Sequence, residues 1–345
     1  MYIKRFKASS PKGEIELVRL ENSIGAWVEL SSLGAGITAV CVPDKNGTIQ
    51  NVALSYADPA DYLDDGPCMG KTPGRYANRI GKGHLEIDGK VYSLPINNGP
   101  NHLHGGPEGF QNQLWNMEVV DDKVIFSLKS PDGDMGYPGN LNVKVTYSWS
   151  DDCRLEITLE AETDRTTAVN LTNHTYWNLR GGDFKSALEH TLRINASRYL
   201  PTDENLTPTG ELDPVEGTPM DFRSGKVVGQ DIKADFPALK YGKGYDACWA
   251  IDEADGKTVK EGVVLHDPVS GRTLTVETDQ PGVQIYTGNW LAGSPANRYG
   301  RSYEDYEGIA IEAQGFPDAP NHANFPEQLL QPGQRYIRHI NYIFS

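Results

Sequence analysis

The chain has 345 residues, of which 32 are basic and 47 acidic, so its net charge is -15 at pH 7. No basic run could follow a phosphate backbone, which argues against nucleic acids and anionic membrane surfaces as partners. The four cysteines are far apart and form no CxxC pair, so we expect reduced, mostly buried thiols rather than a zinc knuckle or a disulfide framework.

The first twenty residues, MYIKRFKASSPKGEIELVRL, contain basic residues but no apolar core and no small-residue cleavage site. No stretch of the sequence approaches the ~18 consecutive apolar residues of a membrane span. We therefore expect a cytoplasmic protein.

Short runs of alternating apolar and polar residues, separated by Gly, Asn, Asp and Pro, recur along the chain. The segment ELSSLGAGITAV (29–40) predicts a strand, a turn and a second strand. It lacks the third glycine of a dinucleotide-binding turn. DPADYLDDG (58–66) predicts a short helix, and HLEIDGKVYSL (84–94) predicts a hairpin with a two-residue turn at Asp88 and Gly89.

Further strand pairs are predicted within 119–128, 142–163 and 262–279, and sustained helical periodicity is scarce. No long linker, low-complexity tract or internal repeat divides the chain. Residues 1–345 are therefore predicted to form a single, large, mostly antiparallel all-β domain with few short helices.

Six polar clusters interrupt this pattern. NLTNHTYWNL (170–179) is predicted to be a strand with one hydrogen-bonding face. That face carries Asn170, Thr172, His174, Tyr176 and Asn178, and the opposite face carries Leu171, Trp177 and Leu179. The other clusters contribute Asn78 and Arg79 in GRYANRIGKG, His102 and His104 in NNGPNHLHGG, Asp246 in KGYDACW, Gln284 in QPGVQIYTGNW, and Glu312 and Gln314 in GIAIEAQGFPDAPNHANFP.

Each cluster also has a structural interpretation. A lone histidine on a strand is more often structural than catalytic, and Arg79 could pair with any of many carboxylates. Glu312 is different, because it lies in an apolar strand and carboxylates are seldom buried without a partner or a function. A metal site of His102, His104 and His174 is a weaker alternative, because nothing in the sequence brings the three together. Gly105 and Gly106 instead suggest a close approach of two backbones.

Together the clusters hold the side chains that a polyhydroxylated neutral ligand requires. Sugar hydroxyls need many polar partners, and aromatic rings such as Tyr176, Trp177, Tyr286 or Trp290 could cover the apolar face of a pyranose.

The chain resembles the aldose 1-epimerase (galactose mutarotase) family. The matching segments, in family order over almost the whole chain, are LGAGITAVCVPDKNG, NRIGKGHLEIDGKVYSL, NHLHGG, SPDGDMGYPGN, NLTNHTYWNL, QPGVQIYTGN and EAQGFPDAPN. This resemblance implies a large β-sandwich of the galactose mutarotase-like supersandwich type, with an open sugar cleft, no cofactor and no metal.

The resemblance also implies roles for individual residues. Glu312 is implied as the general base and His174 as the general acid, and the implied sugar-binding residues are Arg79, Asn78, His104, Asp246 and Gln284. The partner is a small sugar such as galactose or glucose, and the protein would be a monomer or a homodimer.

Trp177 and Trp290 depart from the family pattern, since Phe is expected in many relatives. Two other functions stay open on the sequence. A glycoside hydrolase would use Glu312 and Asp246 as its two carboxylates. A non-catalytic sugar-binding protein would need the hydroxyl-binding residues without an acid and a base.

Overall fold

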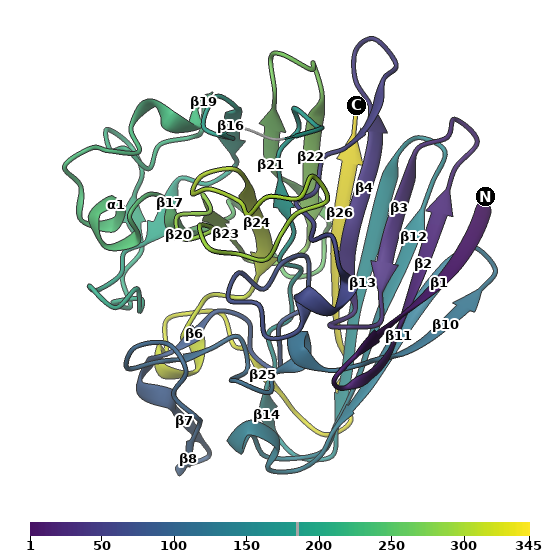
Figure 1. Cartoon of the computed structure of the whole chain (residues 1–345). Coiled ribbons are helices and arrows are strands. Elements are labelled where there is room, and N and C mark those ends of the chain that lie inside the picture. Colours follow the sequence, from purple (N-terminus) through teal and green to yellow (C-terminus); the bar gives the residue numbers. More distant parts are fainter. Residues whose placement is uncertain (184–185) are drawn as a thin grey trace.

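The computed structural model describes residues 1–183 and 186–345, and over this range antiparallel strand pairs build three main sheets (Figure 1). The largest sheet has nine strands. In the order of pairing these are β10 (Asn116–Val120), β11 (Lys123–Ser130), β12 (Leu141–Trp149), β13 (Arg154–Thr163), β26 (Tyr336–Phe344), β22 (Thr273–Thr278), β21 (Lys260–His266), β16 (Thr191–Ile194) and β19 (Lys226–Val227). The last strand of the chain, β26, thus joins β13 to β22.

Two further sheets supply the facing layers. The five-stranded sheet runs β1 (Tyr2–Ser10), β2 (Gly13–Glu21), β3 (Trp27–Ser31), β4 (Gly36–Pro43) and β5 (Ile49–Asn51). The six-stranded sheet runs β15 (Tyr176–Trp177), β24 (Ile309–Gln314), β23 (Gly282–Tyr286), β20 (Asp246–Ala250), β17 (Arg198–Leu200) and β18 (Asp213–Pro214).

Smaller elements lie between the sheets. Three two-stranded pairs are β6 (Arg79–Ile80) with β9 (His102–Leu103), β7 (His84–Ile87) with β8 (Lys90–Ser93), and β14 (Thr167–Ala168) with β25 (Leu329–Leu330). The α-helix is α1 (Pro237–Gly242), and the 3-10 helices are η1 (Pro59–Tyr62), η2 (Gly81–Gly83), η3 (Phe110–Asn112), η4 (Asp134–Gly136), η5 (Val228–Gln230) and η6 (Ala319–Asn321). None of the helices in the described residues is long and apolar enough to cross a membrane.

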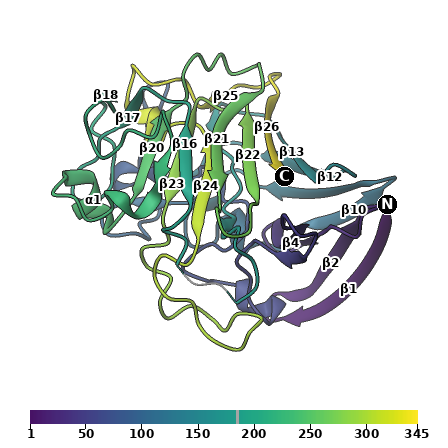
Figure 2. The same cartoon turned by 90° about the horizontal axis from the view of Figure 1, so that it is seen from above.

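The alternation in the strands decides which side chains enter the core. In β12 the residues Leu141, Val143, Val145 and Tyr147 are buried and the residues between them are more exposed, as a sheet with one covered face requires. Figure 2 shows β1 to β4 facing β10 to β13 across this core. The buried side chains of both halves form one continuous cluster, so the fold is a large antiparallel β-sandwich.

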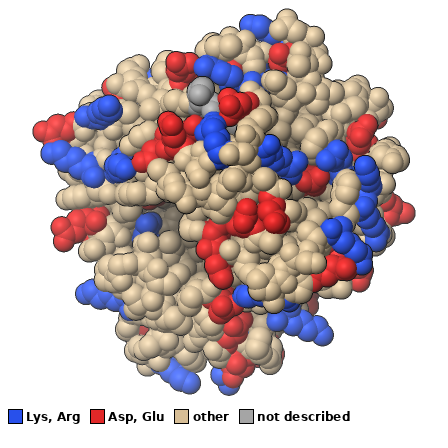
Figure 3. Space-filling view, viewed as in Figure 1, with Lys and Arg blue, Asp and Glu red and all other residues tan. Residues whose placement is uncertain are grey.

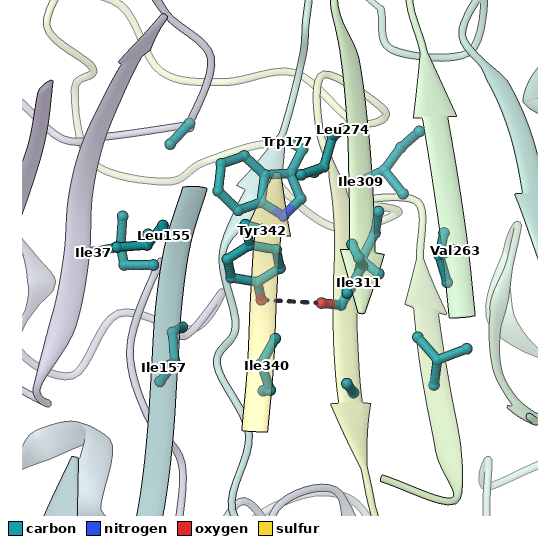
Figure 4. Packing of buried hydrophobic residues seen from close by; sticks show 14 of the residues in the cluster. Ile37, Leu155, Ile157, Trp177, Val263, Leu274, Ile309, Ile311, Ile340 and Tyr342 are labelled. Carbon is teal, nitrogen blue, oxygen red and sulfur yellow. Dashed lines mark hydrogen bonds between the residues drawn. The ribbon is translucent and has the colours of Figure 1, made fainter. Parts of the chain in front are cut away.

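The six-stranded sheet packs on the other half of the nine-stranded sheet. Figure 4 shows Ile309 and Ile311 of β24 against Tyr342 of β26, whose hydroxyl donates a hydrogen bond to the carbonyl of Ile311 at 3.4 Å. Since one face of β24 is held in this core, the side chain of Glu312 points to the opposite side.

Several predictions from the sequence are confirmed. The hairpin at 84–94 forms, with both turn residues at positive φ (Asp88 at 53° and Gly89 at 75°), as a primed two-residue turn needs. The short helix predicted in 58–66 is η1. The segment 29–40 is β3, a turn and β4. All four cysteines are free and buried.

The predicted strand at 170–179 is largely wrong. Only Tyr176 and Trp177 form a strand, Asn170 forms an isolated bridge with Tyr76, and residues 171–175 are irregular. Most polar side chains of the segment bind backbone groups. The Asn170 amide donates to the carbonyls of Ala77 (3.2 Å) and Gly315 (3.3 Å), and the Thr172 hydroxyl donates to the Ala313 carbonyl at 2.7 Å. These residues replace the hydrogen bonds that a regular ladder would have supplied.

Candidate active site

Polar side chains from distant segments meet in a cleft of about 460 Å³, lined by residues of β6, β9, β15, β20, β23, β24 and their loops. This volume falls in the range typical of small-molecule sites. Six of the seven predicted site residues line the cleft: Asn78, Arg79, His104, His174, Asp246 and Glu312. The sequence could not show that these clusters converge.

Glu312 is the most buried charged residue of the cleft wall. Its side chain is 2% exposed, and its Oε1 lies 3.4 Å from Nε2 of His174. Its other oxygen, Oε2, has no hydrogen-bond partner among the described residues. A buried carboxylate oxygen without a partner is costly unless a ligand supplies one.

Burial changes the proton affinities of both groups. It raises the pKa of Glu312 well above its usual value, and the nearby negative charge of Asp246 adds to this, while Arg79 opposes it. The pKa of His174 is lowered to about 4, chiefly by burial and in smaller part by the positive charge of Lys71, while a backbone hydrogen bond opposes the change. Both shifts favour the uncharged forms of the two groups, a protonated Glu312 and a neutral His174.

His104 stands beside this pair, held by an exchange of bonds with Asn78. The rings of His104 and His174 are 5.2 Å apart, edge to face. The Asn78 backbone N–H donates to Nδ1 of His104 at 3.0 Å, and the His104 N–H donates to the Asn78 carbonyl at 3.0 Å. Both residues have positive φ, 64° and 52°, a conformation that Asn and His tolerate better than most residues.

Gly105 follows His104 where two loops touch. A Cβ at this position would lie 1.7 Å from the carbonyl oxygen of Gly74, so only glycine fits. The close backbone approach predicted from the Gly-Gly pair is therefore confirmed.

Arg79, Asp246 and Gln284 form a connected chain. The Arg79 guanidinium lies 3.8 Å from the Asp246 carboxylate, and its Nε donates to Oδ1 of Asn98 at 3.2 Å. The Gln284 amide donates to Oδ1 of Asp246 at 2.6 Å. Gln284 stands opposite Glu312 in the β23–β24 pair but does not line the cleft. Its side chain points to the same face of the sheet as Glu312 and holds Asp246 through its amide.

A metal ion is the alternative that this geometry raises, because the ligand atoms of His104, His174 and Glu312 all lie within 4.8 Å of one another. The hydrogen bonds of His104 argue against it. A metal-binding histidine usually donates its second ring nitrogen to an acceptor, whereas Nδ1 of His104 accepts a backbone N–H. A neutral His104 therefore carries its proton on Nε2, and this N–H can donate a hydrogen bond to a ligand. His102, the third residue of the sequence-based alternative, is not in this group. It binds the Pro95 carbonyl and the Tyr137 hydroxyl, each at 2.7 Å.

Aromatic side chains form the side and the rim of the cleft. Tyr176 and Tyr286 have ring centroids 5.9 Å apart, and Trp290 stacks on Tyr286 at 6.3 Å. Trp290 is 49% exposed, so its indole is accessible at the rim. Trp177 is fully buried and packs on Tyr342 and Phe344 instead, so only one of the two predicted indoles reaches the cleft.

Sequence reasoning missed part of the lining. Tyr241 lies in α1, a helix too short to show a periodic pattern, and Glu204 and Leu206 lie in a loop with no recognisable motif. Asn98 lies in the segment NNGPNHLHGG, where the histidines are the stronger signal of a functional site. Its contact with Arg79 could have been suspected only from the density of amides around it.

The family model described as Aldose 1-epimerase matches residues 16–342 of the chain. A galactose mutarotase from Rattus norvegicus is 43% identical over 318 residues, which cover 92% of this chain and 91% of that protein. An aldose 1-epimerase from Escherichia coli (strain K12) is 39% identical over 342 residues, covering 98% and 97%. The crystal structure of a GalM/aldose epimerase homologue from C. elegans superposes with a TM-score of 0.87 at 31% identity, covering 99% of each chain.

Proposed function

The chain belongs to the aldose 1-epimerase family and interconverts the α and β anomers of a free aldose, and we propose that Glu312 and His174 perform this reaction as general base and general acid. The observation that carries the proposal is the 3.4 Å approach of Nε2 of His174 to Oε1 of Glu312, with Oε2 left without a protein partner among the described residues. A base and an acid this close suit a reaction whose two proton transfers occur at oxygens on one carbon.

The reaction needs no other chemical group. Glu312 removes the proton from the C1 hydroxyl while His174 protonates the ring oxygen, so the C1–O5 bond breaks and an aldehyde forms. Rotation about C1–C2 presents the other face of the carbonyl. His174 then takes the proton back from the O5 hydroxyl and Glu312 returns its proton to O1, which closes the ring as the opposite anomer.

The electrostatics of the cleft favour the open-chain stage. At that stage Glu312 is protonated and His174 is neutral. This is the distribution that burial favours in the free cleft, because it raises the pKa of Glu312 and lowers that of His174. Before the ring opens, the reacting distribution, with Glu312 ionised and His174 protonated, is therefore the less favoured one, and ring opening returns the pair to the distribution that burial favours.

The remaining polar side chains hold the sugar. Arg79 and Asn78 offer donors, Asp246 accepts from hydroxyls, and His104 donates through Nε2. Gln284 keeps Asp246 oriented. Because Asp246 is engaged by Arg79 and Gln284, and Glu312 faces a histidine, the arrangement supports an acid–base pair rather than the two carboxylates of a glycoside hydrolase.

The charges of the cleft favour an uncharged sugar. Arg79 is the sole Lys or Arg among the described lining residues, and it is shared with Asp246. The described part of the cleft lining holds three acidic residues, Glu204, Asp246 and Glu312. Figure 3 also shows acidic side chains near the middle of the drawn face. A phosphorylated sugar would find little to balance its charge here.

Polarimetry of freshly dissolved α-D-galactose tests the function. The protein is expected to accelerate the change in optical rotation many-fold over buffer, and the acceleration should survive EDTA, since protons move between Glu312, His174 and the sugar alone. Loss of the acceleration in EDTA, with recovery on adding a divalent metal, would contradict the proposed roles. Glucose, xylose and arabinose assayed in the same way would rank the substrates.

Replacing Trp290 by alanine is expected to raise KM for galactose about two- to tenfold with little change in kcat, because a ring contact contributes roughly 0.5–1.5 kcal/mol. The indole lies at the rim of the cleft, where it stacks on Tyr286. Initial rates over a range of galactose concentrations measure both constants. Trp290→Phe is the matched control and should keep most of the affinity. An unchanged KM in the alanine variant would show that the indole does not contact the sugar.

A further inference from the structure

A buried ion pair lies beside the cleft and has no part in the reaction described above. Lys71 and Asp65 are in direct contact, and their side chains are 1% and 0% exposed. The Lys71 ammonium also donates to the Tyr62 carbonyl at 2.5 Å and to Oδ1 of Asn112 at 3.3 Å. Taking two charges out of water is expensive, and well-packed apolar side chains in their place are often as stable or more so. Stability alone therefore gives no reason for this pair.

The pair fixes a loop that forms one wall of the cleft. Oδ2 of Asp65 accepts hydrogen bonds from the Tyr56 hydroxyl at 3.1 Å and from the Met69 backbone at 2.8 Å. The loop between Asp65 and Lys71 carries Gly66 and Pro67, which line the cleft. The Tyr176 hydroxyl donates to the Pro67 carbonyl at 2.9 Å, so the loop is also tied to the ring beside His174.

The end of the same loop holds the backbone of His174. The Gly70 N–H donates to the His174 carbonyl at 2.9 Å, and the His174 N–H donates to the Lys71 carbonyl at 2.8 Å. The Asn173 side chain adds a bond to the Gly70 carbonyl at 3.0 Å. His174 lies outside any strand, so its backbone is held by this loop and not by the hydrogen bonds of a sheet. The loop therefore sets the position of the imidazole.

Gly70 makes this approach possible. A Cβ there would lie 2.0 Å from the Ile37 carbonyl oxygen, and its φ is 69°. The backbone is thus pressed between β4 and His174, and the ion pair anchors both ends of the loop that enters this space.

The geometry points to a positioning role: we propose that the buried Lys71–Asp65 pair holds His174 in line with Glu312, and so acts on the rate of the acid–base step. The proposal rests on the role of His174 proposed above. The positive charge of Lys71 also lies close enough to lower the pKa of His174, after the larger effect of burial. The other titratable groups facing this imidazole are Glu312, His104 and Tyr176.

The test compares Lys71→Met with the double variant Lys71→Met/Asp65→Asn. The single variant leaves Asp65 as a buried charge without its partner, so its Tm is expected to fall. The double variant should recover most of that Tm, because neither charge remains. Its kcat for galactose is nevertheless expected to stay at least tenfold below that of the wild type, with KM changed less than threefold. The acidic limb of its kcat/KM profile should move to higher pH, since losing the charge of Lys71 raises the pKa of His174.

The matched control is Lys226→Met/Asp231→Asn. This pair has its Nζ and Oδ2 atoms 2.7 Å apart, and neither residue lines the cleft. It should keep wild-type kcat and an unchanged pH profile. A Lys71→Met/Asp65→Asn protein with wild-type kcat and an unmoved acidic limb would overturn the positioning role. That result would leave the acid–base assignment intact, because that assignment is tested separately by the Glu312→Gln and His174→Asn variants and by the EDTA assay.

A milder variant keeps the proposal testable if the double variant does not fold. Tyr56→Phe removes one hydrogen bond to Asp65 and preserves the ring. It is expected to lower kcat two- to fivefold at constant KM. Wild-type kcat in this variant would also overturn the proposal.

Discussion

Replacing Glu312 by glutamine is expected to reduce kcat for mutarotation of galactose by about 10² to 10⁴, the range for losing one positioned acid–base group. The amide has nearly the shape of the carboxyl group but cannot take the C1 proton. The buried site should accept it without loss of fold, because burial already raises the pKa of Glu312 and favours its uncharged form. Polarimetry with galactose at several concentrations gives kcat and KM separately.

The control for this variant is Glu204→Gln. Glu204 also lines the cleft but is exposed, and it is expected to keep kcat near the wild-type value. If Glu312→Gln retained more than a tenth of wild-type kcat while folded, the general base would have to be sought elsewhere in the cleft.

Replacing His174 by asparagine should lower kcat by a similar 10² to 10⁴ with little loss of stability. The bonds that hold position 174 use its backbone N–H and carbonyl, and any residue supplies these. In the wild type, kcat/KM is expected to fall below about pH 4, where His174 gains a proton and the pair holds two. The variant's residual activity should lack this limb, and pH–rate profiles of both proteins would show it.

His102→Asn is the control for His174→Asn. Its ring nitrogens bind the Pro95 carbonyl and the Tyr137 hydroxyl in the interior, so the change should lower Tm and leave the kcat of the folded protein nearly intact. Near-wild-type activity of His174→Asn would show that another group protonates the ring oxygen.

The fold was predictable where local rules act alone. The Asp88–Gly89 turn and the alternation of β12 and β13 need only neighbouring residues to specify them, and the structure confirms both. Segment 170–175 needed more. Its polar side chains form hydrogen bonds with the backbone of Ala77, Ala313 and Gly315, which are distant in sequence. Because these partners cannot be known from the local sequence, the alternating pattern of the segment predicts a strand.

The site shows the same division. The types of the candidate residues were visible in the sequence, but their convergence was not. The loop from Asp65 to Lys71 contains no recognisable motif. Its proposed role could be inferred only from its contacts with His174 in the structure. The sequence predicts Gln284 among the sugar-binding residues, but it could not predict the hydrogen bond by which the Gln284 amide holds Asp246.

The place of β26 in the large sheet has a consequence for the newly made chain. This strand leaves the ribosome after both of its neighbours, since it pairs with β13 on one side and β22 on the other. Until it emerges, two strands completed much earlier in synthesis each have an unpaired edge, and such edges promote association between chains. Glu312 is translated after every other residue of the proposed site, so enzymatic activity would report that the chain has been made and folded at least as far as β24.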